Sequence, residues 1–89
     1  MEVEVKKLSE QEVEAARIRN WPIWEKEKSS FDWCYDGKET CYFLEGNVEI
    51  ELPDGKRVKI EQGDLAVFPK GLSCKWHINK KVKKHYNFE

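Results

Sequence analysis

Polar and apolar residues alternate through residues 31–46, FDWCYDGKETCYFLEG, on both sides of Asp36-Gly37. Alternation with a period of two indicates β-strands, and Asp-Gly is a frequent two-residue hairpin turn. The pattern puts Glu39, Cys41 and Phe43 of the second strand on one face, together with three aromatic residues of the first strand. Those aromatic residues are Phe31, Trp33 and Tyr35. The alternation therefore predicts a carboxylate among aromatic rings and a thiol.

A second alternating stretch, residues 63–76 with the sequence GDLAVFPKGLSCKW, contains the turn signal Pro69-Lys70-Gly71. Beyond this turn, four residues share one face of the expected strand: Leu72, Cys74, Trp76 and Ile78. Each hairpin thus contributes one reactive group to the interior, Glu39 from the first and Cys74 from the second.

The rest of the chain predicts one short helix and further strands. Residues 2–6, EVEVK, alternate as an edge strand would, and Ser9 with Glu12 has the spacing of a capping box, which predicts a helix over about residues 10–18. From Trp21 onward, turn signals recur roughly every eight to twelve residues, as in antiparallel sandwiches and barrels, so about eight strands are expected. Besides the turns above, the signals are Lys28-Ser29-Ser30, Glu45-Gly46, Pro53-Asp54-Gly55, Gln62-Gly63-Asp64 and Asn79-Lys80-Lys81.

Residues 40–44 are apolar on both faces of their expected strand, since Tyr42 and Leu44 lie opposite Cys41 and Phe43. A strand of this kind must be covered on both sides. Either the N-terminal helix or a second subunit could provide the outer cover. Because one short helix covers little area, we predict a homodimer.

Composition narrows the choice of partners and compartment. The 89 residues include 16 Lys plus Arg against 17 Asp plus Glu, a net charge of −1, which gives no electrostatic basis for binding nucleic acid or an anionic membrane. Three cysteines without a Cys-x-x-Cys pair argue against a disulfide framework and a zinc ribbon. With neither a leader pattern nor a long apolar stretch, a cytoplasmic protein is expected. A charged fraction of 37% fits a thermophilic protein or an ordinary solvated surface.

The spacing of glycine and proline resembles that of a known superfamily. Cupins are recognised by two motifs, G-x5-H-x-H-x3,4-E-x6-G and G-x5-P-x-G-x2-H-x3-N. Here Glu39 is followed by six residues and Gly46, and Gly63 is followed by five residues, Pro69, one residue and Gly71. The whole pattern, with WPIWE before it and KHYNF after it, resembles the small single-domain cupins grouped with the ureidoglycine aminohydrolase cupin domain.

The resemblance covers about residues 21–88. It implies an all-β fold, a small cupin-type jelly-roll β-barrel with one short N-terminal helix. We therefore expect residues 1–89 to form a single cupin domain.

The resemblance also identifies four metal-ligand positions, and only Glu39 among them carries the usual residue type. Trp33 and Tyr35 stand where the first motif has its two histidines, and Cys74 stands where the second has its histidine. We therefore predict no metal and no cofactor. A makeshift site of Glu39 with Cys74 and Cys41 stays open, because thiolates favour zinc.

Glu39 and Cys74 are the candidate catalytic residues. Four others are candidates for binding a small molecule: Trp33, Tyr35, Cys41 and Trp76. A carboxylate in an aromatic pocket is unfavourable unless hydrogen bonds satisfy it or its pKa rises. Because no Lys or Arg shares its inward face on neighbouring residues, we expect a raised pKa for Glu39. A Glu39→Gln variant is then expected to be as stable as the parent, or more stable, at pH 7. Glu39 is either a satisfied structural acid or a general base.

Neither histidine is expected to act in the site. His77 falls on the face opposite Cys74 and Trp76, which predicts a solvated side chain. His85 lies in a basic run and is expected to be a surface histidine or a satisfied structural one.

Two functions are open. The first is a small-molecule-binding cupin without transition-metal chemistry, whose aromatic walls, carboxylate and thiol suit a small planar or carbonyl-containing ligand. The second is an enzyme of the ureidoglycine aminohydrolase-like class that acts on a small carbonyl or amide compound, with Glu39 as acid or base. We favour the first, because a fold alone does not imply a reaction once the metal ligands have been replaced.

Overall fold

The computed structural model describes residues 2–89. Over these residues the chain is mostly β-strand with one short α-helix, as predicted. The elements in chain order are β1 (Glu4–Lys7), α1 (Glu10–Ala15), η1 (Ile18–Asn20), β2 (Ile23–Lys26), β3 (Ser29–Cys34), β4 (Glu39–Glu51), β5 (Arg57–Glu61), β6 (Asp64–Phe68) and β7 (Ser73–Phe88). Met1, the first residue of the predicted domain 1–89, lies outside the described residues.

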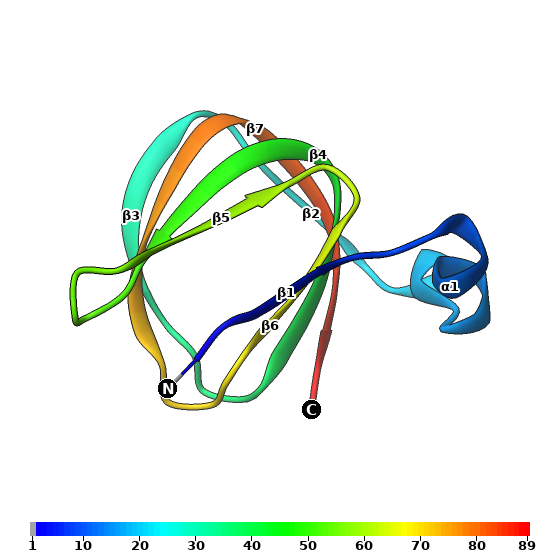
Figure 1. Cartoon of the computed structure of the whole chain (residues 1–89), viewed down its shortest axis with the longest axis horizontal. Helices are drawn as coiled ribbons and strands as arrows, with labels where there is room; N and C mark the ends of the chain where they lie inside the picture. Colours follow the sequence, from blue (N-terminus) through cyan, green and yellow to red (C-terminus); the bar gives the residue numbers. More distant parts are fainter. Residues whose placement is uncertain (1) are drawn as a thin grey trace.

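The strands form one antiparallel sheet in the order β1-β6-β4-β7-β2, with β3 paired to β7 and β5 paired to β4. The sheet curls into a barrel, and α1 lies outside it on one side (Figure 1). The two long strands, β4 and β7, pair with each other from Glu39 opposite Phe88 to Glu51 opposite Lys75. They carry most of the residues that point into the barrel, because alternate residues along each strand face inward.

Two expected turns are wrong, because both long strands continue through them. Glu45-Gly46 lies inside β4, and Asn79-Lys80-Lys81 lies inside β7. The β4–β7 pairing shifts register at three places between Phe43 and Val48, which indicates bulges rather than chain reversals. Gly46, in this segment, has a φ of +121°, a backbone conformation that residues with a side chain rarely adopt. A bulge bends a strand and increases its twist, so the residues that signalled turns instead curve the barrel.

Gly46→Ala is expected to destabilise the fold by roughly 2–4 kcal/mol, through backbone strain and crowding together. An alanine Cβ would lie 2.8 Å from Val82 Cγ2 and 3.0 Å from the Lys81 carbonyl oxygen. Gly55 is the matched control, since it also has positive φ, +90°, but a Cβ there meets nothing within 4 Å. Gly55→Ala should therefore cost only about 1 kcal/mol. Urea unfolding of both variants tests this, and equal losses would refute the role given to crowding at Gly46.

The N-terminal helix begins as predicted and ends earlier. Ser9 and Glu12 form the reciprocal capping box, with Glu12 N donating to Ser9 Oγ at 3.2 Å and Ser9 N donating to Glu12 Oε1 at 3.1 Å. The helix stops at Ala15, and Arg17 is left-handed with φ of 55°. In one continuous helix, Val13 and Ile18 would point about 140° apart. The break at Arg17 turns Ile18 onto the sheet beside Val13, where both are buried.

The helix covers the outer face of the two-sided strand, which confirms the first of the two predicted covers. Val13, Ile18 and Tyr42 form a buried cluster on this side, and four partly buried residues pack against it: Leu8, Trp21, Leu44 and Leu65. The homodimer stays a prediction, as does the cytoplasmic location. Within residues 2–89, no helix has the length and apolar character needed to cross a membrane.

Candidate functional site

A buried carboxylate, thiol and ammonium meet inside the barrel. Glu39 Oε2 accepts hydrogen bonds from Cys41 Sγ at 2.7 Å and from Lys84 Nζ at 2.9 Å. Lys84 Nζ also donates to Cys41 Sγ at 3.2 Å, so each group contacts the other two. Glu39 and Lys84 are only 4% and 5% exposed. The acid, which is the residue hardest to explain as packing, therefore has an opposite charge beside it.

The two central strands put these side chains together. Glu39, Cys41 and Phe43 alternate along β4, and Lys84 of β7 lies opposite Phe43. The Lys84 side chain carries its ammonium to 4.7 Å from the Trp76 ring centroid and 4.9 Å from the Trp24 ring centroid. A cation this close to indole faces is stabilised by the ring quadrupole, an effect that grows as water is excluded.

Beside the charged cluster is a narrow cavity of about 40 Å³, walled by aromatic side chains. Its lining residues are Trp24, Phe31, Trp33, Tyr35, Glu39, Trp76 and Lys84. Pockets for drug-sized ligands are roughly 300–1,000 Å³, so this cavity restricts any occupant to a few heavy atoms. Trp33 is 48% exposed whereas Tyr35 and Trp76 are buried, which places Trp33 at the entrance and the other two rings deeper.

The deep wall is held rigidly. Trp76 Nε1 donates to the Tyr35 hydroxyl at 3.1 Å, so the buried indole N–H is satisfied. Tyr35 stacks on Phe68 with ring centroids 4.8 Å apart, and Trp76 stacks on Phe31 at 5.9 Å. Burial raises the pKa of the Tyr35 hydroxyl far above its ordinary value, so this group stays protonated.

One carboxylate oxygen of Glu39 takes no part in the charged cluster. Both hydrogen bonds to Glu39 end on Oε2, and Oε1 accepts none from residues 2–89. In that part of the chain, no buried side-chain nitrogen or oxygen lacks a partner. Oε1 therefore keeps some accessible surface, and Glu39 is one of the residues that line the cavity. The carboxylate has an acceptor available for a ligand, next to an ammonium donor.

The thiol beside the carboxylate is Cys41 and not Cys74, which corrects the expected Glu39–Cys74 arrangement. Cys41 is fully buried, and burial raises the pKa of its thiol well above the ordinary value. Cys74 lines a separate surface hollow at the end of β3, with Asp32 and Cys34. Burial, with Cys34 and Asp32 nearby, raises the pKa of the Cys74 thiol to about 11. The catalytic role of Cys74 stays a prediction, and no contact with the charged cluster supports it.

Thiol alkylation should follow this difference in environment. At pH 8 a thiol with a pKa of about 11 is only about 0.1% thiolate, the reactive form. Cys34 is exposed, whereas Cys41 and Cys74 are buried. Iodoacetamide at pH 8 is therefore expected to modify Cys34 at least tenfold faster than Cys74, and labelling of Cys74 should rise as the pH approaches 11. Peptide mass mapping measures both rates, with Cys34→Ser as the control. Fast labelling of Cys74 at pH 8 would contradict its assigned environment.

Lys84 and Trp24 are the site residues that the sequence analysis missed. The premise that no Lys or Arg shares the inward face with Glu39 is wrong, because Lys84 contacts it directly. The alternation of β7 carried the signal: Lys84 lies between Val82 and Tyr86 on the apolar phase of the strand. A lysine in this basic run gives no local sign that its ammonium is buried, because its acidic partner is on another strand.

The site does not fit the metal that the cupin motifs imply. At the ligand positions, Trp33 and Tyr35 offer an indole and a protonated phenol, and the ammonium of Lys84 takes the place beside Glu39 where a cation would bind. Across residues 2–89, no three His, Cys, Asp or Glu side chains are grouped closely enough to hold a metal ion. The makeshift site of Glu39, Cys41 and Cys74 therefore does not form.

Both histidines lie away from the cavity. His77 lies on the outer face, where Nε2 is 2.9 Å from Glu51 Oε1 and Nδ1 is 3.1 Å from Ser30 Oγ, so it is partnered rather than simply solvated. His85 is buried, with Nδ1 2.8 Å from the Trp21 carbonyl oxygen. Of the two roles expected for His85, the structure therefore confirms the satisfied structural histidine and not the surface histidine.

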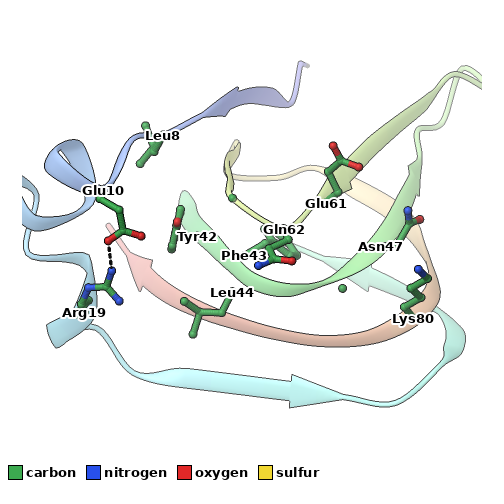
Figure 2. A pocket seen from close by; sticks show the side chains of 12 residues that line it. Leu8, Glu10, Arg19, Tyr42, Phe43, Leu44, Asn47, Glu61, Gln62 and Lys80 are labelled. Atoms are coloured by element: carbon green, nitrogen blue, oxygen red, sulfur yellow. Dashed lines mark hydrogen bonds and ion pairs between the residues drawn. The ribbon is translucent and has the colours of Figure 1, made fainter.

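A larger groove of about 700 Å³ lies on the outside of the barrel, between the N-terminal helices and β4. In Figure 2, Arg19 and Glu10 form an ion pair at one end, and Asn47 and Lys80 lie at the other. Glu39, Cys41 and Lys84 do not line it. Its charged groups are exposed at the rim, so the groove lacks the buried reactive cluster of the interior.

Comparison with known proteins identifies relatives of this chain. The model of the EutQ-like cupin domain family matches residues 13–86. The chain is similar to the acetate kinase EutQ of Clostridioides difficile (strain 630), with 29% identity over 56 residues, which is 63% of this chain. The matched region spans only 35% of the length of that curated relative.

Solved structures give the same fold. A DUF861-family protein from Thermotoga maritima is 51% identical, with a TM-score of 0.96 over 99% of this chain and 100% of that one. The EutQ protein of Clostridium difficile is 24% identical, with a TM-score of 0.67 over 94% of this chain and 64% of that one, a likeness in fold alone. These structures confirm the barrel predicted from the two motifs. The grouping with the ureidoglycine aminohydrolase cupin domain stays a prediction.

Proposed function

This chain belongs to the EutQ-like cupin domain family, and from that premise we propose that its barrel binds a small planar molecule carrying a carbonyl or amide group. The observation that carries the proposal is the open Glu39 Oε1 beside the Lys84 ammonium at the base of an aromatic cavity. An amide has both complements, since its N–H can donate to the carboxylate and its carbonyl can accept from the ammonium. Aromatic walls suit its flat faces.

The size of the cavity sets the expected affinity. A ligand of four or five heavy atoms in about 40 Å³ can gain only a few kcal/mol, so dissociation constants of about a millimolar are expected. Acetamide and urea are suitable probes. Acetate is the control, because it has no N–H and would bring a second negative charge next to Glu39.

The four tryptophans supply an internal control for the binding test. Trp24, Trp33 and Trp76 line the cavity, whereas Trp21 packs in the outer cluster under the helix. Titration with acetamide, followed by the indole N–H signals in ¹H–¹⁵N spectra, should shift those of the three cavity residues saturably and leave that of Trp21 unchanged. Absence of saturable shifts with both acetamide and urea, or equal shifts for Trp21, would overturn the proposal.

A second candidate function is hydrolysis of a small amide or ureido compound, as in the ureidoglycine aminohydrolase-like class, with Glu39 as the base. The open Oε1 favours it, since a water bound there would donate to the carboxylate and become more nucleophilic. Ammonia release from such compounds, measured on the purified protein and on a Glu39→Gln variant shown to be folded, tests this function. Equal rates for the two proteins would exclude Glu39 as the base.

A further inference from the structure

The Lys84 amine is a second reactive group in the cavity, and it is a nucleophile. Primary amines in water-excluded pockets form imines with carbonyl compounds. Lys84 combines the required features: it is 5% exposed, lines the cavity, and lies 2.9 Å from a carboxylate that can accept its proton. We propose that Lys84 forms a covalent, protonated imine with small aldehydes of one to three carbons. This inference rests on the proposed function, because it uses the same cavity.

A protonated amine has no lone pair and cannot attack a carbonyl carbon, so Lys84 must first lose a proton. Glu39 Oε2 lies within hydrogen-bond distance and can accept it. Lys84 transfers one proton to Glu39 Oε2, which leaves a free amine and a neutral carboxylic acid. A low-dielectric site raises the free energy of an ion pair more than that of two neutral groups. The proton transfer therefore costs less free energy here than it does in water. The amine lone pair then attacks the aldehyde carbon, so that a C–N bond forms and the C=O π electrons move to oxygen. This oxygen takes one of the two protons of the newly bonded nitrogen, which gives a neutral carbinolamine.

Loss of water completes the step. The carbinolamine oxygen takes the proton held by Glu39 and leaves as water, the C–O bond breaks, and the nitrogen lone pair forms the C=N bond. The net change converts the ammonium and the aldehyde into a protonated imine and water, with no redox change. The product keeps the positive charge and one N–H, so the hydrogen bond from nitrogen to Glu39 is retained. The buried charge balance is the same before and after reaction.

The surroundings favour an imine over its hydrolysis. The Trp76 and Trp24 rings lie 4.7 Å and 4.9 Å from Nζ, so a cation at this position keeps its aromatic contacts. The same rings exclude bulk water, which would reverse the reaction. The cavity volume of about 40 Å³ limits the carbonyl partner to a very short chain. Lys84 therefore has a limit on the size of its carbonyl partner that surface lysines do not have.

Reductive trapping tests the inference on the intact protein. Acetaldehyde at one equivalent, with cyanoborohydride at pH 7, is expected to ethylate Lys84 at least tenfold faster than Lys83, its half-buried neighbour on the same strand. Pivaldehyde, which is too bulky for the cavity, should label surface lysines and spare Lys84. Peptide mass mapping gives the site of each label. Lys84 modified no faster than Lys83, or equally by both aldehydes, would overturn the proposal.

Further measurements separate this inference from the proposed function. Saturating acetamide should slow ethylation of Lys84 and leave that of Lys83 unchanged. Lys84→Met should lose the fast label and Lys83→Met should keep it; if Lys84→Met does not fold, mapping of the parent protein decides. Indole shifts with acetamide but no trapping at Lys84 would overturn the imine alone. Absence of both would overturn the proposed function as well.

Discussion

Glu39→Gln is expected to lower the free energy of unfolding by about 3–5 kcal/mol at pH 7, which is the cost of leaving one member of a buried ion pair without its partner. The Lys84 ammonium, 2.9 Å from the carboxylate and 5% exposed, would lose its counter-ion in a water-excluded site. The amide also cannot accept from both the Cys41 thiol and the ammonium as strongly as a carboxylate does. Urea unfolding measures the loss.

This result would reverse the expectation drawn from the sequence, which was that the same variant is as stable as the parent or more stable. The reversal has one cause, the presence of Lys84 beside the acid. A matched control is Glu61→Gln, since Glu61 also pairs with a lysine, Lys7 at 3.2 Å, but both side chains are more than half exposed. Exposed pairs contribute about 0–1 kcal/mol, so Glu61→Gln should have little effect.

A double variant tests whether the loss comes from the unpaired charge. Glu39→Gln with Lys84→Met removes both charges and should be more stable than either single variant, because a buried ion pair can be replaced by apolar groups at little cost. If Glu39→Gln alone were as stable as the parent, the ion pair would not be a structural anchor, and Glu39 would be free for a purely functional role.

Trp76→Ala is expected to destabilise the barrel by about 3–5 kcal/mol, through lost burial and the cavity left behind. The Trp76 indole contacts the rings of Trp24, Phe31, Phe43 and Phe68, and its N–H donates to the Tyr35 hydroxyl at 3.1 Å. The loss is a large part of the stability of a small domain, roughly 5–15 kcal/mol in total. Thermal or urea unfolding measures it.

Trp33→Ala is the control of the same residue type, and it separates stability from binding. Trp33 is 48% exposed at the cavity entrance, so its removal should cost about 1 kcal/mol or less. It should nevertheless weaken the binding of acetamide, because one aromatic wall is lost. Equal destabilisation by the two variants would show that Trp33 is part of the core and not the edge of a site.

Several features follow from the sequence alone. The alternation of residues 31–46 predicted the strands and the shared face of Glu39, Cys41 and the aromatic rings, and the Ser9–Glu12 spacing predicted the helix start. These are local properties: a period of two fixes which side chains share a face, and a cap needs only three residues of spacing. The glycine and proline spacing similarly indicated the cupin barrel.

Only the tertiary structure decided the identity of the charged cluster. Glu39 and Lys84 are 45 residues apart in the chain, and nothing local relates them. The register of β4 against β7 brings them together, and that register depends on the bulges around Gly46, which the sequence presented as a turn. The same pairing explains why Cys41, and not Cys74, is the thiol that contacts Glu39. The alternation along one strand gives the face on which a side chain lies but not its position along the barrel. Pairing between distant strands fixes that position, and with it which groups can share a proton.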